Sequence, residues 1–133
     1  MNPHYPFVAR RARHICEYCR APEAVFNLPF EIDHIIPLSR GGDDDQNNLA
    51  LSCRSCNLYK SDSVSAFDEE TQTAIRFFNP RLDDWAEHFV FDRKTGEIKS
   101  ITPIAEATIL RLRINSKAQL AARIQWLQLG FFN

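Results

Sequence analysis

The chain has 133 residues, of which 44% are hydrophobic and 25% charged, and its formal net charge is −1. This composition is that of an ordinary one-domain globular protein, and no apolar run approaches the roughly 18 residues that a membrane-spanning helix needs. Because the N-terminus also lacks an apolar signal core, the chain is expected to be cytoplasmic and to have no membrane partner.

The charges are unevenly distributed along the chain. Residues 1–20 carry four Arg against one Glu, and residues 103–133 carry four basic residues against one acid. Residues 61–100 carry nine acids against five bases. The small net charge predicts no strong non-specific attraction to nucleic acid, so if nucleic acid binds, the two basic ends should supply the phosphate contacts. The alternative is that these ends are merely a solvated surface.

The first half of the chain predicts a helix, a loop and then a strand, loop, strand and helix. A short helix is expected over residues 8–15, and the two prolines of residues 20–29 indicate a loop. Residues 30–36 are apolar and β-branched enough for a strand. After a polar, turn-rich loop, residues 49–52 predict the second strand of an antiparallel hairpin, and residues 54–60 predict a helix that folds back on it.

The second half of the chain predicts a β-hairpin followed by two helices. Over residues 61–80 neither the helical nor the strand period dominates. Residues 88–92 and 97–101 are strand-like on either side of a turn and predict the hairpin. The Thr-Pro pair at positions 102–103 is a typical helix start, and Ser116 is the expected cap of the last helix.

The apolar residues of these two helices recur at helical spacing. Ala107, Leu110 and Ile114 fall on one face of the first helix, and Leu120, Ile124 and Leu127 align in the second. The apolar surface of this segment, which includes Trp85, Phe89, Phe91, Leu110, Ile124 and Trp126, is too large to stay exposed. We therefore expect residues 79–133 to pack, as a C-terminal extension, on a core formed by residues 14–62, so that residues 1–133 form one domain.

All four cysteines fall in two Cys-x-x-Cys pairs, Cys16 with Cys19 and Cys53 with Cys56, separated by 33 residues. Thiolates are soft ligands, and two such pairs close a tetrahedral Zn²⁺ site that has no open position and is therefore structural. Such a site would pin the turn before the hairpin to the start of the helix after it. The alternatives are redox dithiols or buried cysteines without special chemistry, but a redox pair usually stands alone.

Other ligand-type residues lie between the cysteine pairs and directly after them. Asp33 and Asn57 carry the hard oxygen donors that Mg²⁺ or Mn²⁺ prefers. His34 has a side chain that titrates near neutrality, which makes it a candidate general base, the alternative being a hydrogen-bonded histidine at a strand end. Because neighbours on a regular strand point to opposite faces, Asp33 and His34 share a site only if the strand twists or bulges there.

Three motifs together resemble the HNH endonuclease family. They are the stretch 31–42 (EIDHIIPLSRGG), the pair Asn48-Leu49 and the Cys-x-x-Cys-Asn-x-x-Lys motif that ends at Lys60. The likeness covers residues 16–60 and implies a ββα-metal core, here in a variant with a structural four-cysteine zinc site. With the predicted C-terminal β-hairpin and two helices, the expected fold class is α+β.

The resemblance also implies roles for single residues. His34 would be the base that activates water, and Asp33 and Asn57 would hold a catalytic Mg²⁺ or Mn²⁺. Asn48 matches the middle Asn of the family, which fixes the loop between the strands. Lys60 matches a basic position that could contact phosphate, the alternative being a plain surface lysine.

The activity implied is metal-dependent hydrolysis of phosphodiester bonds in nucleic acid, with DNA as the expected substrate. One alternative is a non-catalytic zinc module that binds nucleic acid or protein on the same scaffold. The presence of Asp33, His34 and Asn57 disfavours it, because a binding module has no need of that trio. A second alternative is a nuclease toxin, although nothing in the sequence shows a delivery domain. The sequence does not indicate which protein partners, if any, the chain has.

Overall fold

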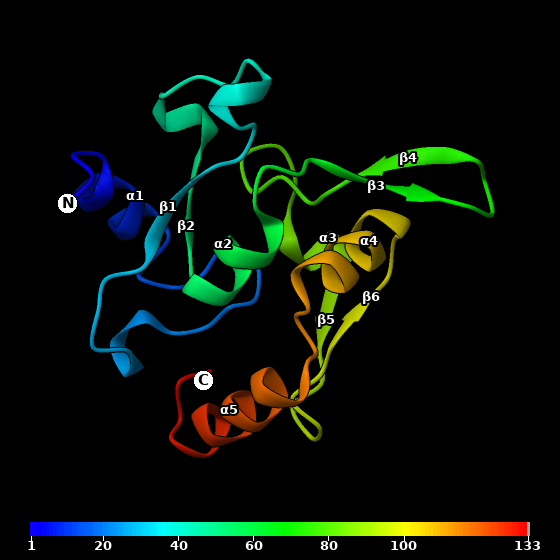
Figure 1. Cartoon of the computed structure of the whole chain (residues 1–133). Helices are drawn as coiled ribbons and strands as arrows, with labels where there is room; N and C mark the ends of the chain where they lie inside the picture. Colours follow the sequence, from blue (N-terminus) through cyan, green and yellow to red (C-terminus); the bar gives the residue numbers. More distant parts are fainter. Residues whose placement is uncertain (133) are drawn as a thin grey trace.

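The computed structural model describes residues 1–132 of the chain (Figure 1). The α-helices are α1 (Tyr5–Arg11), α2 (Arg54–Lys60), α3 (Trp85–His88), α4 (Pro103–Leu112) and α5 (Lys117–Gln128). The strands are β1 (Glu31–His34), β2 (Leu49–Ser52), β3 (Ser65–Asp68), β4 (Thr73–Arg76), β5 (Phe89–Phe91) and β6 (Ile98–Ser100). Short 3-10 helices lie at Glu23–Val25, Leu38–Arg40 and Gln46–Asn48.

The first half of the chain folds as a β-hairpin with a helix against it. Strands β1 and β2 are antiparallel, and their pairing runs without interruption from Glu31 opposite Ser52 to His34 opposite Leu49. All four residues of β2 are buried, and α2 packs on the hairpin (Figure 1). The predicted strand, loop, strand and helix are therefore confirmed. Strand β1 is shorter than predicted, and the bulge considered near Asp33 is absent from the pairing.

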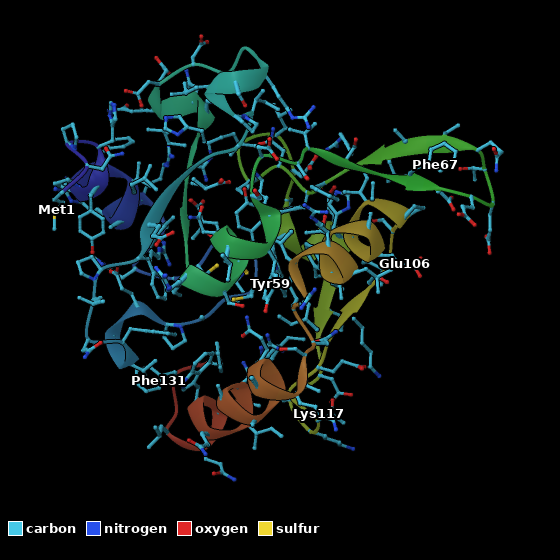
Figure 2. The ribbon with its side chains drawn as sticks, in the orientation of Figure 1. Met1, Tyr59, Phe67, Glu106, Lys117 and Phe131 are labelled. Atoms are coloured by element: carbon cyan, nitrogen blue, oxygen red, sulfur yellow. The ribbon has the colours of Figure 1, made fainter. Side chains whose placement is uncertain are left out.

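The ambiguous segment 61–80 contains a second hairpin, formed by β3 and β4. Ser65 pairs with Arg76 and Asp68 with Thr73. The hairpin projects away from the other elements, and Phe67 lies on its outer part with 62% of its surface exposed (Figures 1 and 2). Because most of this hairpin is solvated, its sequence does not need the apolar alternation by which a half-buried strand is recognised.

A third hairpin and two capped helices complete the fold. Strands β5 and β6 form the hairpin predicted near residues 88–101, with shorter strands than expected. The hydroxyl of Thr102 accepts a hydrogen bond from the amide of Ala105 at the start of α4. The hydroxyl of Ser116 accepts one from the amide of Gln119 at the start of α5. Both predicted N-caps are therefore confirmed.

The residues that align along α4 and α5 in the sequence are not the ones that face the interior, although Phe89 and Trp126 are buried as expected. Leu110 on α4 is 71% exposed, and Ile114, although buried, lies beyond the end of that helix. The residues that are buried in the two helices are Ala105, Thr108 and Leu112 in α4 and Gln119, Arg123 and Trp126 in α5. Thr108 and Arg123 face the interior because their side chains form hydrogen bonds with buried main-chain groups there. The spacing of apolar residues in the sequence does not reveal such hydrogen bonds.

Several contacts join the second half of the chain to the turn at residues 16–19 and to α2. The Trp85 indole donates a 3.0 Å hydrogen bond to the carbonyl of Tyr18. Arg81 forms an ion pair with Glu17, and the guanidinium of Arg111 donates to the carbonyl of Tyr59 at 2.9 Å. These contacts support the proposal that residues 1–133 form a single domain.

Candidate metal centre and candidate active site

The four cysteines of the chain converge on one buried point. Their Sγ atoms all lie within 4.8 Å of one another, and Figure 2 shows the sulfur atoms in yellow beside the first turn of α2. The sulfurs of Cys19 and Cys53 are 3.6 Å apart. Two thiolates on one tetrahedral Zn²⁺ lie about 3.8 Å apart, because each Zn–S bond is about 2.3 Å long. The spacing therefore fits a single ion.

Local geometry holds each pair of cysteines in place. Cys16 and Cys19 lie on a tight turn in which the amide of Arg20 donates to the carbonyl of Cys16 at 3.0 Å. Cys53 is the N-cap residue of α2, and its sulfur accepts a hydrogen bond from the amide of Cys56. The second pair is thus fixed by the helix start and the first by the turn.

The four thiols influence one another's pKa, so that deprotonation of one makes deprotonation of its neighbours less favourable. Burial by itself raises the pKa of Cys16, but hydrogen bonds with the thiols of Cys19, Cys53 and Cys56 lower it well below its usual value. The sulfur of Cys16 in turn raises the pKa of Cys53 and of Cys56. A soft divalent cation removes this unfavourable effect by binding all four thiolates, so the donor set fits Zn²⁺ and not an oxygen-preferring ion.

The carboxylate of Asp33 on β1 is buried and is held from two sides. The hydroxyl of Tyr18 donates to its Oδ2 at 2.6 Å. The ammonium of Lys60, at the end of α2, lies 3.1 Å from Oδ2 and 3.3 Å from Oδ1. Burial raises the pKa of Asp33, and the charge of Lys60 and the Tyr18 hydroxyl oppose that rise. Asp33 thus lies in the interior with a cation already beside it.

Lys60 does not occupy the surface position that the sequence left open. It is 2% exposed, and its ammonium also donates to the carbonyl of Ile35 at 3.1 Å. The surface-lysine alternative is therefore wrong. A phosphate contact would require the ammonium to leave Asp33.

His34 follows Asp33 on β1 and pairs with a different carboxylate, that of Asp44, which also lies 3.6 Å from His4. Its Nε2 lies 2.9 Å from an oxygen of Asp44, in the loop between β1 and β2. The hydrogen bond with His34 lowers the pKa of Asp44. A neutral imidazole that donates its Nε2–H to Asp44 keeps the lone pair on Nδ1, and this nitrogen is then the one able to take a proton.

Asn48 fixes the loop that carries Asp44. Its side-chain oxygen accepts from the amide of Ile36 at 2.9 Å, and its amide nitrogen donates to the carbonyls of Ile36 and Asp43 at 2.9 and 2.8 Å. Gly42 allows this close packing, because a Cβ there would lie 1.8 Å from the carbonyl oxygen of Ile36. The loop is thereby folded back so that Asp44 reaches His34.

Asn57 on α2 lies across from β1, and its amide nitrogen donates to the carboxylate of Glu31. Its side-chain oxygen has no hydrogen-bond partner within residues 1–132. A cavity of about 290 Å³ is lined by Asp33, His34 and Asn57, together with Asp62 and others. The structure therefore brings the three residues singled out in the sequence to one cavity, without the strand bulge that seemed necessary.

The oxygen donors of this cavity fit a hard divalent cation in type. A carboxylate can accept about four hydrogen bonds or ligand contacts, and Oδ1 of Asp33 makes only the 3.3 Å contact with Lys60. Asn57 offers an unpaired amide oxygen on the same cavity. An ion there would share Asp33 with the ammonium of Lys60, which already offsets the negative charge of that carboxylate.

Three residues of the two centres were not singled out in the sequence: Tyr18, Glu31 and Asp44. Signals existed for all three. Tyr18 lies between two of the cysteines, Glu31 is two positions from Asp33 on the same strand face, and Asp44 belongs to a run of acids in the loop that Asn48 fixes.

The segment that contains both centres matches a known protein family. Residues 16–63 match the family model described as HNH endonuclease. The matched segment begins at the first cysteine of the cluster, ends shortly after α2 and covers a little over a third of the chain. The match confirms that this segment is of the HNH type, in an α+β structure with a four-cysteine cluster.

No curated protein and no solved structure matches the chain. Within the part of the chain that the structure describes, no helix combines the length and the apolar character needed to cross a bilayer.

Proposed function

We propose that the protein is a divalent-metal-dependent HNH endonuclease that hydrolyses phosphodiester bonds in nucleic acid, with DNA as the expected substrate. The observation that carries the proposal is the single cavity lined by Asp33, His34 and Asn57 within the segment of HNH type. A general base, a carboxylate and an amide oxygen on one cavity are the parts that metal-assisted hydrolysis needs.

Each residue has a distinct role in this proposal. Asp33 and Asn57 would hold Mg²⁺ or Mn²⁺, which when bound supplies Lewis-acid stabilisation of charge on the phosphate. His34 takes a proton from the attacking water at Nδ1, because Asp44 accepts the Nε2–H. Asn48 acts indirectly, since it folds the loop that brings Asp44 to His34.

We further propose that Cys16, Cys19, Cys53 and Cys56 hold one structural Zn²⁺. The four sulfurs leave no position for a substrate, so this ion takes no part in the chemistry. It instead joins the turn at Cys16 to the start of α2, the helix that carries Asn57 and Lys60.

The second candidate is a zinc-stabilised binding module without catalysis. The pairing of Lys60 with Asp33 favours it, because a cation of the protein itself already neutralises the carboxylate. The pairing of His34 with Asp44 disfavours it, because a binding module does not require a histidine oriented by a carboxylate.

The two candidates are separated by a cleavage assay with zinc-loaded protein on plasmid DNA and on RNA. Mg²⁺ or Mn²⁺ should permit cleavage and EDTA should abolish it. His34→Ala should reduce the rate roughly 10²–10⁴-fold, the usual contribution of a general base, and should keep its zinc. His14→Ala is the matched control, because His14 pairs with Glu23 and lies outside the cavity. Absence of cleavage with any divalent ion, or full activity of His34→Ala, contradicts the endonuclease.

A further inference from the structure

A groove of about 650 Å³ lies between the projecting β3–β4 hairpin and α4. Figures 1 and 2 show the two elements that border it, with Phe67 on the hairpin and Glu106 on α4. The apolar part of its lining includes Phe67, Ile75 and Leu110. Phe67 is 62% exposed and Leu110 is 71% exposed. Exposed apolar side chains that gather at one place mark an interaction site, whereas single ones do not.

The hairpin is fixed at its base, so the groove is formed before any partner arrives. The guanidinium of Arg76, the last residue of β4, makes two hydrogen bonds to the carboxylate of Asp83, at 2.7 and 2.9 Å. Phe78, two residues further on, is buried, and its amide donates to the hydroxyl of Thr108 on α4 at 2.8 Å. A preformed groove loses less conformational entropy when a ligand binds, which favours binding.

The charged residues of the groove are mostly acidic. Among residues 1–132, the carboxylates that line it are those of Asp68, Glu69, Glu70 and Glu106. The one basic residue of the lining in that part of the chain is Arg111, whose Nε–H donates to the carbonyl of Tyr59. Glu69, Glu70 and Glu106 form no ion pair within residues 1–132. These three carboxylates are therefore available to cations of another molecule.

The combination of apolar and acidic surface determines which kind of molecule fits the groove. Nucleic acid is disfavoured, because its phosphates would face a surface of the same sign. A protein segment that carries Lys or Arg beside apolar side chains matches both features. Its apolar side chains would cover Phe67 and Leu110, and its cations would meet the carboxylates at the edge of the groove.

We propose that the groove between the β3–β4 hairpin and α4 is a docking site for a basic amphipathic segment of another protein. The proposal does not depend on zinc binding or on cleavage, because the lining residues within 1–132 include no member of the cysteine cluster or of the candidate active site. It assigns a protein-binding surface to elements that lie outside the segment of HNH type.

The test is the binding of a fluorescein-labelled peptide of Leu and Lys, arranged at the spacing of an amphipathic helix, to the full chain. Fluorescence anisotropy should show saturable binding that weakens as salt is added, because the carboxylates are exposed. A peptide with Glu in place of each Lys should not bind. Leu110→Gln removes an apolar contact but keeps a good helix former, and should weaken binding about tenfold or more. Glu106→Lys should weaken it similarly, by repulsion.

Leu82→Gln and Glu87→Lys are the matched controls. Both residues are exposed, and neither lines the groove. Glu87→Lys changes the net charge of the protein as much as Glu106→Lys does, so a general effect of charge would appear in both variants. Both controls should bind the peptide like wild type. Should Leu110→Gln disturb α4, which circular dichroism would reveal, Phe67→Ser on the hairpin carries the same test.

Absence of saturable binding of the Leu and Lys peptide overturns the proposal. Equal affinities of the groove variants and their controls overturn it as well, because the peptide would then bind elsewhere. Sedimentation of the wild-type chain tests the other occupant of such a groove. A dimer that Leu110→Gln dissociates would show that a second copy of this chain covers the groove, and the proposed partner would be wrong.

Discussion

The hydroxyl of Tyr18 donates a 2.6 Å hydrogen bond to the carboxylate of Asp33, and both side chains are buried. Tyr18 lies between Cys16 and Cys19, so the turn that carries two of the four sulfurs also positions the carboxylate of the candidate active site. The indole of Trp85 in turn donates to the carbonyl of Tyr18. The two proposed metal centres are therefore linked through one tyrosine.

Tyr18→Phe removes only the hydroxyl of this link. Because hydrogen bonds to charged groups contribute about 1.5–3 kcal/mol, we expect a loss of stability of that order and a weaker response of cleavage to Mn²⁺, with zinc retained. Urea denaturation and a Mn²⁺ titration of the activity measure the two effects. Tyr59→Phe is the control, because its hydroxyl has no hydrogen-bond partner among the described residues. Equal behaviour of the two variants would refute the link.

Lys60→Met should make the stability of the protein depend on divalent ions. Removing one partner of a buried ion pair costs about 3–5 kcal/mol, because the other charge is left uncompensated. We expect the free energy of unfolding of the zinc-loaded protein to fall by about that amount in buffer without added Mg²⁺ or Mn²⁺. It should recover in part when either ion is added, because the ion can take the place of the ammonium beside Asp33. Lys99→Met, at a half-exposed lysine paired with Asp92, is the control. A Lys60→Met protein that unfolds like wild type without these ions would contradict the pairing.

Glu23 should make the fold sensitive to acid. Burial raises its pKa, but the amide of Phe30 and the side chains of His14 and Tyr5 outweigh this, and the net pKa lies below the usual value of 4.5. A carboxyl whose pKa is lower in the folded state contributes stability above its unfolded pKa and loses it as the pH falls through the folded pKa.

Glu23→Gln should accordingly be less stable than wild type at neutral pH, and the difference should shrink as the pH falls below about 4.5. Thermal denaturation of both proteins between pH 3 and pH 7 measures this. A difference in melting temperature that stays constant over the whole range would show that the charge of Glu23 is not the cause.

Cys53→Ser separates the metal from the helix cap. Ser is a favourable N-cap residue, so the start of α2 is preserved while one zinc ligand is lost. We expect wild type to contain about one zinc per chain, and Cys53→Ser to bind zinc weakly and to be strongly destabilised, because structural zinc contributes folding free energy directly. Elemental analysis and thermal denaturation provide the measurements. If zinc-free wild type is as stable as zinc-loaded wild type, a structural role of the ion is excluded.

The sequence predicted the elements whose signals are local. The bounds of β2 and α2 agree with the prediction because a short apolar strand and a cysteine cap define them within a few residues. The caps Thr102 and Ser116 are local in the same sense. The grouping of the four cysteines also followed from their spacing, since Cys-x-x-Cys pairs leave few other arrangements.

The parts that the sequence did not predict depend on distant contacts. Arg123 is buried because its guanidinium donates to the carbonyls of Gly96 and Ile114, which lie outside its helix. Asp33 and His34 share a cavity without a strand bulge because α2 and the loop after β1 both border it. The partner of Lys60 could not be recognised either, since Asp33 lies 27 positions before it in the chain.

The position of Cys56 in the chain has a consequence for synthesis. Cys56 completes the four-cysteine set 61 residues before α5 begins at Lys117, which at about 5–20 residues per second is an interval of roughly 3–12 s. We therefore expect the nascent chain to bind the proposed zinc ion before its last helix has been synthesised.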